Sequence, residues 1–183
     1  KVFKLGYHDY VNRERICGLL RFNSSTLADA DALTSLDDYM ARAPEGQKVI
    51  WYVAAPNREA ARLNPHMERF RRKGIEVLWL YEPVDEFVMD SLAKYKDWEF
   101  KSVETAADDA LNDFADKEQP QHEAAAPLSE DDNASFEALL EKMKGILGEK
   151  VTDVRVSHRL ADSPAVLVSP DGGMSSSMEK LLK

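Results

Sequence analysis

The sequence predicts an α/β fold: a small three-layer αβα unit with a mostly parallel sheet, preceded by a helical segment and followed by a truncated α+β unit. Three runs of β-branched and aromatic residues, at 49–53, 75–81 and 98–103, predict buried strands. Amphipathic helical patterns separate these runs. Strands joined through helices form parallel sheets by right-handed crossovers, so helices are expected on both faces of this sheet.

Two helices are expected before the first strand. The first spans 10–21, where apolar residues recur on one helical face. The second begins after Ser35, whose hydroxyl can cap the first turn, and ends near Arg42. Asp37 and Asp38 lie in that first turn, where the helix dipole favours negative charge. A Pro-Glu-Gly turn then leads into the first strand.

Further helices are expected between the strands. Asn57 is placed to cap one helix, and Pro65 opens another that ends at Gly74. Three basic residues before this glycine strengthen the stop signal. After the second strand, Pro83 begins a helix that continues to about Tyr95 and carries an apolar side.

An acidic stretch divides the chain. Residues 104–133 carry ten acidic side chains and one basic side chain, so their net charge of −9 equals that of the whole chain. No apolar period is sustained there, which predicts a flexible linker because little surface can be buried to offset the ordering entropy. An acidic segment that binds basic partners is the alternative. The expected division is a helical segment at 1–25, the αβα unit at 26–104, the linker at 105–129 and the second unit at 130–183.

The second unit is expected to begin with a helix over 129–147, whose apolar residues follow helical spacing. Apolar runs at 154–156 and 165–168 predict strands. A final helix is predicted from an apolar stripe, formed by Met174, Met178, Leu181 and Leu182. This order of elements predicts the α+β class, with a sheet too small to be complete.

The composition disfavours several classes of function. An acidic balance without a basic stripe argues against nucleic-acid binding. No apolar run approaches the roughly 18 to 20 residues that span a bilayer. A single cysteine cannot form an internal disulfide and is typical of a reducing compartment.

Few residues suggest chemistry. The loops after the predicted strands lack the glycines of a phosphate cradle, so nucleotide binding by this segment is disfavoured. The histidines, His8, His66, His122 and His158, lie far apart and without neighbouring cysteines, which favours surface or structural roles over metal ligation. Cys17 is expected to pack in the core and not to act as a nucleophile. The sequence therefore predicts no catalytic, cofactor-binding or metal site.

Several short sequence blocks follow one another in the same order as in a known protein family. They are Asn12-Arg13-Glu14, Leu19-Leu20-Arg21-Phe22 with Ser24-Ser25, Ser35-Leu36-Asp37-Asp38-Tyr39, Glu45-Gly46-Gln47-Lys48, Pro83 to Phe87, Asp162-Ser163-Pro164-Ala165 and Gly173-Met174-Ser175. Together they resemble the heat-shock protein 90 family of molecular chaperones. Residues 51–58 and 102–105 are more similar to the mitochondrial paralogue, the tumour necrosis factor receptor-associated protein type. Residues 162–165 and the methionine helix are instead similar to bacterial members.

The resemblance implies the end of a middle domain and the start of a carboxy-terminal domain. In this family ATP and Mg²⁺ bind in an amino-terminal domain, and stable dimerisation uses helices of the carboxy-terminal end. We therefore expect no ATP hydrolysis and no cofactor in this segment, and a mainly monomeric fragment of a homodimeric protein. Unfolded or partly folded client proteins are the implied partners. The implied location is the mitochondrial matrix, with the bacterial or eukaryotic cytoplasm as the alternative.

The resemblance also implies a client-contacting surface, at positions Glu86, Phe87, Met174, Met178 and Leu181. Exposed methionines suit varied apolar partners because their side chains are unbranched and polarizable. The alternative interpretation places the methionines and Phe87 in the core or against a subunit partner. Two other functions stay open: an inter-domain scaffold without client contact, and a stand-alone α/β ligand-binding enzyme domain.

Overall fold

The computed structural model describes residues 9, 11–107, 109–117, 130–157, 160 and 163–168. Its helices are α1 (Arg13–Leu19), α2 (Leu36–Arg42), α3 (Arg58–Arg62), α4 (Met67–Arg72), α5 (Pro83–Leu92) and α6 (Glu130–Leu147), with a short 3₁₀ turn at Gly148–Lys150. Its strands are β1 (Asn23–Ser24), β2 (Val49–Ala54), β3 (Leu78–Leu80), β4 (Lys94–Tyr95) and β5 (Trp98–Ser102).

The strands form one five-stranded sheet in the order β1-β3-β2-β5-β4. The central strand β2 pairs in parallel with β3 and with β5, in registers that set Tyr52 opposite Leu78 and Ile50 opposite Phe100. The edge strands β1 and β4 pair antiparallel with β3 and β5. The prediction of a mostly parallel sheet with crossover helices is confirmed.

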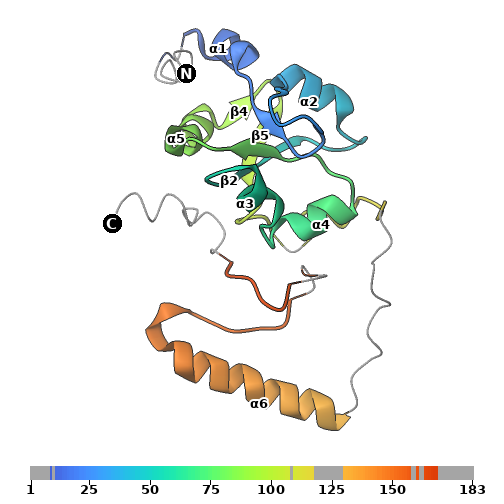
Figure 1. The fold of residues 1–183 in the computed structure, drawn as a ribbon, viewed down its shortest axis with the longest axis vertical. Coiled ribbons are helices and arrows are strands. Elements are labelled where there is room, and N and C mark those ends of the chain that lie inside the picture. Colours follow the sequence, from blue (N-terminus) through green and yellow to red (C-terminus); the bar gives the residue numbers. More distant parts are fainter. Residues whose placement is uncertain are drawn as a thin grey trace.

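Two apolar cores lie on the two faces of this sheet, because side chains alternate along β2. Ile50 and Tyr52 belong to the core that includes residues of α1, α2 and α5. Trp51 and Val53 belong to the other core, with residues of α3 and α4. Figure 1 shows the sheet between α1 and α2 on one side and α3 and α4 on the other. This is the expected αβα layering.

The predicted helix caps are present. The Ser35 hydroxyl accepts a hydrogen bond from the Asp38 amide at 3.0 Å, and the Asn57 side chain accepts one from the Ala60 amide at 2.9 Å. Gly74 follows α4 with a φ of +62°, a left-handed conformation that favours glycine.

Both edge strands were absent from the prediction. β1 lies in a stretch for which the sequence predicts no strand, and β4 lies where the helix from Pro83 is expected to continue. The helix instead ends at Leu92, because Ala93 takes a φ of +54° and redirects the chain into β4. Two-residue strands carry too few side chains to show a period in the sequence.

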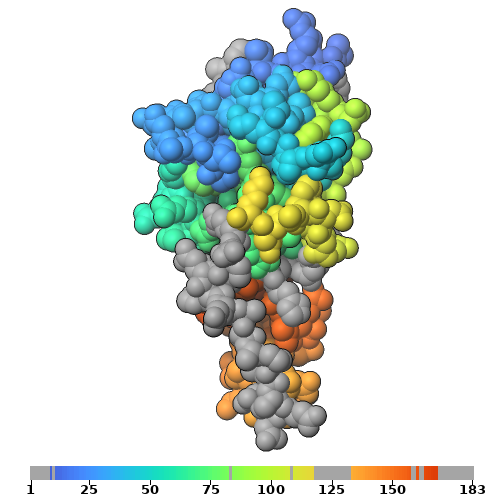
Figure 2. All heavy atoms as spheres, turned by 90° about the vertical axis from the view of Figure 1, so that its right-hand side faces the viewer, coloured from blue at the N-terminus to red at the C-terminus, as the bar shows by residue number. Residues whose placement is uncertain are grey.

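The α/β unit continues beyond the predicted boundary at residue 104. Ala106 and Leu111 are buried in the core against α3 and α4, and Phe114 packs beside them. The Lys117 amide donates to the Arg72 carbonyl at 2.9 Å. Figure 2 shows residues 109–117, in yellow, lying against the body of the unit. The first part of the expected linker is therefore folded, since a few apolar residues among the acids suffice to hold it.

The second unit matches its prediction only in its helix. α6 begins and ends close to the expected bounds, but 154–156 and 165–168 are not strands. A strand needs a neighbour to satisfy its backbone groups, and these runs have none among the described residues. Most of the apolar stripe of α6 is exposed, including Phe136, Leu139 and Ile146. The predicted helix with Met174, Met178 and Leu181 lies outside the described residues.

Candidate functional site

Helix α5 carries the two predicted client-contacting residues that the structure describes. Its first turn begins at Pro83 and is closed by a capping box, in which the Glu82 amide donates to the Asp85 carboxylate at 3.4 Å. Phe87 is half-buried, but Glu86 is only 1% exposed. In this conformation Glu86 contributes nothing to a client-contacting surface, because helical spacing turns it toward the core with Met89.

Two acids of α5, the buried Glu86 and the exposed Asp90, affect the neighbouring strand. Tyr52 points into the same core, and its hydroxyl lies 3.5 Å from the Asp90 carboxylate. Burial raises the pKa of Tyr52, and the nearby carboxylates of Asp90 and Glu86 add to this shift. Burial also raises the pKa of Asp90. The two carboxylates disfavour ionisation of the Tyr52 hydroxyl, which therefore stays protonated.

A groove of about 350 Å³ opens beside the first turn of α5. It is lined by Leu19, Leu20, Arg21, Phe22, Asn23, Leu33, Trp79, Tyr81, Glu82 and Asp85. Leu19 and Leu33 on its rim are 52% and 56% exposed, while Leu20 and Phe22 are buried in the core. The groove therefore presents accessible apolar surface next to the helix that carries Phe87. We refer to it as the α5 groove.

The indole N–H of Trp79 and the hydroxyl of Tyr81, which line the α5 groove, make no hydrogen bond with any described residue. The Arg58 guanidinium lies 4.9 Å from the centre of the Trp79 ring, and its N–H groups donate to backbone carbonyls of residues 27–29. Burial raises the pKa of Tyr81, so this hydroxyl stays protonated and can donate. An occupant with a carbonyl oxygen would satisfy either donor.

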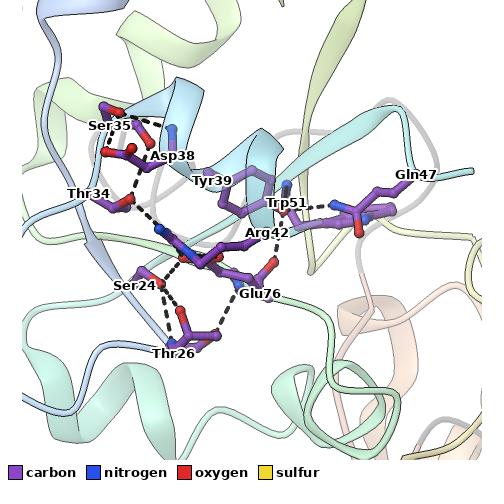
Figure 3. Close-up of polar contacts among 12 residues, drawn as sticks. Ser24, Thr26, Thr34, Ser35, Asp38, Tyr39, Arg42, Gln47, Trp51 and Glu76 are labelled. Carbon is purple, nitrogen blue, oxygen red and sulfur yellow. Dashed lines mark hydrogen bonds and ion pairs between the residues drawn. The ribbon is translucent and has the colours of Figure 1, made fainter. Parts of the chain in front are cut away.

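A polar network around the buried Glu76, shown in Figure 3, fixes the loop that carries Leu33. Arg42 donates to both carboxylate oxygens of Glu76, at 2.9 and 2.7 Å, and to the Thr34 hydroxyl at 2.7 Å. The Ser24 hydroxyl donates to the same carboxylate. Backbone bonds in both directions between Phe22 and Thr34, at 3.0 and 2.8 Å, then close the loop. The wall of the α5 groove is thereby tied to α2 and to the segment before β3.

A second contact region joins α4 to the extended segment 163–168. The His66 Nε2 atom lies 2.9 Å from the Leu167 carbonyl oxygen, and the Ser163 hydroxyl donates to the Glu68 carboxylate. His66 and Glu68 are both buried. The two contacts join residues that are far apart in the chain. The separation is 101 residues for His66 and Leu167, and 95 residues for Glu68 and Ser163.

Cys17 is fully buried against α2 and α5, as predicted. Burial raises the pKa of its thiol to about 11, so the thiol is protonated at neutral pH and is a poor nucleophile. Among the described residues no cluster of three or more histidine, cysteine or acidic side chains is placed to hold a metal ion. No helix in the same residues is long and apolar enough to cross a membrane.

Sequence reasoning missed the groove and the network. Trp79 and Tyr81 follow Glu76 in a run whose pattern predicts only a buried strand. Glu76 within that apolar run was the available signal, because an acid inside a buried strand requires a partner. Nothing in the local pattern identified Arg42, 34 residues earlier, as that partner.

Comparison with known proteins identifies the family. The profile of the Hsp90 protein family matches residues 1–183. The chaperone protein HtpG of Oleidesulfovibrio alaskensis is 59% identical over 183 residues, which is all of this chain and 28% of that protein. HtpG of Nitratidesulfovibrio vulgaris gives the same values, and HtpG of Yersinia pestis is 44% identical over 174 residues, 94% of this chain and 26% of that protein.

A solved structure agrees with these matches. The middle domain of a heat-shock protein of Plasmodium falciparum superposes with a TM-score of 0.51 at 36% identity, covering 55% of this chain and 42% of that one. The three curated relatives named above are bacterial, so the expected resemblance to the mitochondrial paralogue is not supported. The chain belongs to the Hsp90 family.

Proposed function

We propose that this chain is the part of an ATP-dependent chaperone that couples its middle domain to its carboxy-terminal domain. The chain spans 28% of the length of the HtpG proteins of Oleidesulfovibrio alaskensis and Nitratidesulfovibrio vulgaris, so ATP and Mg²⁺ binding, dimerisation and client folding are proposed for the complete protein. The segment itself contributes surfaces and no hydrolytic residues. Bacterial relatives favour the bacterial cytoplasm as its location over the mitochondrial matrix.

The contact between α4 and 163–168 is the observation that carries this proposal. Both bonds involve buried groups at the start of α4, the N-cap residue His66 and Glu68, and a segment from beyond the acidic stretch. A hydrogen bond to a buried charged group contributes about 1.5–3 kcal/mol. The Ser163–Glu68 bond is therefore strong enough to bias the relative position of the two units.

The coupling is tested by Ser163→Ala, which removes the donor to Glu68. In this chain we expect amide hydrogen exchange of α4 to increase by about tenfold, because a bond of roughly 1.5 kcal/mol is lost. In the complete chaperone, ATP turnover should change while nucleotide affinity does not. Ser135→Ala, an exposed position on α6, is the matched control. Unchanged exchange in α4 would contradict the coupling role and favour an independent second unit.

We further propose that the α5 groove contributes to client contact, together with Phe87. The exposed leucines of the rim and the two unpaired donors inside support this role, since an unfolded segment offers both apolar side chains and free carbonyls. Glu86 would act by supporting α5 from the core. The predicted contacts of Met174, Met178 and Leu181 remain part of the same proposal.

Client contact is tested in the complete chaperone with Leu33→Ser. Loss of exposed apolar surface in the α5 groove should weaken suppression of client aggregation by a few fold, while basal ATP hydrolysis is kept. Leu63→Ser is the matched control, because Leu63 is 70% exposed but lies outside the groove. Replacing Met174 and Met178 with serine tests the second part of the surface. Equal protection by the Leu33 and Leu63 variants would favour a scaffold without client contact here.

A further inference from the structure

A second hollow, of about 280 Å³, lies between the turn before β2 and the 109–114 segment. Its lining comprises Glu45, Gly46, Gln47, Lys48, Val49, Trp51, Ala110, Asp113 and Phe114. Figure 2 shows the yellow 109–117 segment beside the cyan part of the chain that contains this turn. We refer to this feature as the Glu45 hollow. It shares no residue with the α5 groove.

The turn on one side of the Glu45 hollow is rigid. The Gln47 amide donates to the Pro44 carbonyl at 3.2 Å, and Gly46 between them takes a φ of +86°. The Gln47 side-chain nitrogen donates to the Val49 carbonyl at 2.7 Å and to the Tyr39 hydroxyl at 3.0 Å. The turn therefore presents its neighbours in a fixed position.

The opposite wall is held as firmly. Lys73 of the α4 end donates to the Phe114 carbonyl at 2.5 Å and pairs with Asp116 at 3.2 Å. Between the walls, Trp51 is 3% exposed and packs edge-on against Phe70, with 5.0 Å between the ring centres. Trp51 and Phe114 thus form the aromatic part of the hollow.

Gln47 leaves one acceptor unused. Its side chain is 4% exposed, and its Oε1 atom accepts no hydrogen bond from the part of the chain that the structure describes. Exchanging the amide oxygen and nitrogen would set oxygen against the Val49 carbonyl, so the orientation is fixed by the two bonds of the nitrogen. Figure 3 shows this oxygen pointing away from the Tyr39 hydroxyl. A buried acceptor without a partner favours an incoming donor.

The charges of the Glu45 hollow select a cation. Within the described part of the chain, Glu45 and Asp113 take part in no ion pair or hydrogen bond of their side chains. The one basic residue of the lining, Lys48, lies with its ammonium 5.6 Å from the Trp98 ring centre. Trp98 is not part of the lining. Two uncompensated carboxylates therefore remain beside an unused oxygen and an aromatic floor.

We propose that the Glu45 hollow binds a basic side chain, lysine or arginine, of a partner polypeptide. The aliphatic stem would lie against Trp51 and Phe114, and the cationic head would donate to Glu45, Asp113 and the Gln47 oxygen. Long basic side chains combine these two properties, whereas a metal ion would gain nothing from the aromatic floor. This site is independent of client contact at the α5 groove.

The test uses the 183-residue chain and nuclear magnetic resonance titration with Nα-acetyl-lysine methylamide. The Gly46 amide and the Gln47 side-chain amide should shift. Nα-acetyl-norleucine methylamide, which has the stem without the charge, should bind at least about fivefold more weakly. Equal shifts of Gly46 and Gln47 with both compounds would overturn the proposal.

Charge-neutral variants give the second arm of the test. Glu45→Gln with Asp113→Asn should weaken binding of the lysine compound by about tenfold, because both ion pairs are lost. Both residues are exposed, so the fold is unaffected. Asp31→Asn with Glu141→Gln changes the net charge equally at exposed positions elsewhere and should bind within about twofold of the unchanged chain. Identical affinities of the two double variants would reject the site.

Discussion

At the scale of single residues, Glu76 is a buried carboxylate of the α/β unit that requires several hydrogen-bonding partners. It is 5% exposed, and it is held by the guanidinium of Arg42 and the hydroxyl of Ser24. The Tyr39 hydroxyl also donates to the Glu76 carbonyl, at 2.8 Å. A buried carboxylate is tolerated only with such partners. These residues come from three separate parts of the chain, and so they fix how those parts meet.

Replacing Arg42 with methionine should therefore destabilise the unit. Removal of one partner from a fully buried pair costs about 3–5 kcal/mol. The Arg42 side chain is 41% exposed, so we expect a smaller loss of about 2 kcal/mol in the free energy of unfolding. Urea denaturation measures this loss, and Arg42→Met combined with Glu76→Gln should recover part of it. Arg62→Met, at an exposed position of α3, should change stability by less than about 0.5 kcal/mol.

The sequence could predict single residues only where the determinant was local. The burial of Cys17 followed from its neighbours on a helical face. The burial of Glu86 could not be predicted in this way, because the family resemblance implied a role for this residue but not the direction of its side chain. The Glu76 network, the unpaired Trp79 indole and the unused Gln47 oxygen all depend on residues distant in the chain. Such groups become visible only once the sheet order is known.

At the scale of elements, the caps explain why the helix starts were predictable. Ser35 bonds to both the backbone amide and the side chain of Asp38, at 3.0 and 2.6 Å. The bond from Ser35 lowers the pKa of the Asp38 carboxyl. Cap signals lie within four residues of one another, so a single sequence contains them completely. Short edge strands such as β1 and β4 have no such local signature.

The cap predicts the effect of Ser35→Ala. Loss of the hydroxyl leaves the Asp38 amide without its acceptor, and the free energy of unfolding should fall by about 1 kcal/mol. The Asp38 pKa should rise toward its ordinary value, which a carboxyl titration by nuclear magnetic resonance can follow. Ser91→Ala is the control, since Ser91 lies inside α5 away from the cap. Equal effects of the two alanine variants would show that the Ser35 hydroxyl has no capping role.

At the scale of the whole molecule, the two cores define one folded unit. Their buried members all lie between Cys17 and Leu111, and they include both faces of the central strand. The unit meets the later segment at α4, while the apolar stripe of α6 is largely exposed. The prediction of a flexible linker was wrong for its first part. The many charges of residues 104–117 concealed the few apolar side chains that pack in the core.

The folded boundary gives the last prediction, a comparison of chains that end at residue 104 and at residue 117. The shorter chain lacks Ala106, Leu111 and Phe114, which cover the core against α3 and α4. Full burial of one leucine contributes about 1.5–3 kcal/mol, so we expect the shorter chain to lose at least about 3 kcal/mol of stability. The chain ending at 117 lacks the bond from Ser163 to Glu68, which contributes roughly 1.5 kcal/mol, so its midpoint should lie between those of the 104 chain and the complete sequence.

Tryptophan fluorescence during urea unfolding can make this comparison. The three tryptophans, Trp51, Trp79 and Trp98, all lie in the α/β unit, so their signal is independent of α6 and the residues that follow it. A third chain that ends at 150 retains α6 and serves as the control for added length. If the chains ending at 104 and 117 unfold at the same urea concentration, the α/β unit ends at residue 104, as the sequence predicts. A lower midpoint for the 104 chain alone would assign the 105–117 segment to the core, because its side chains are the only difference between the two.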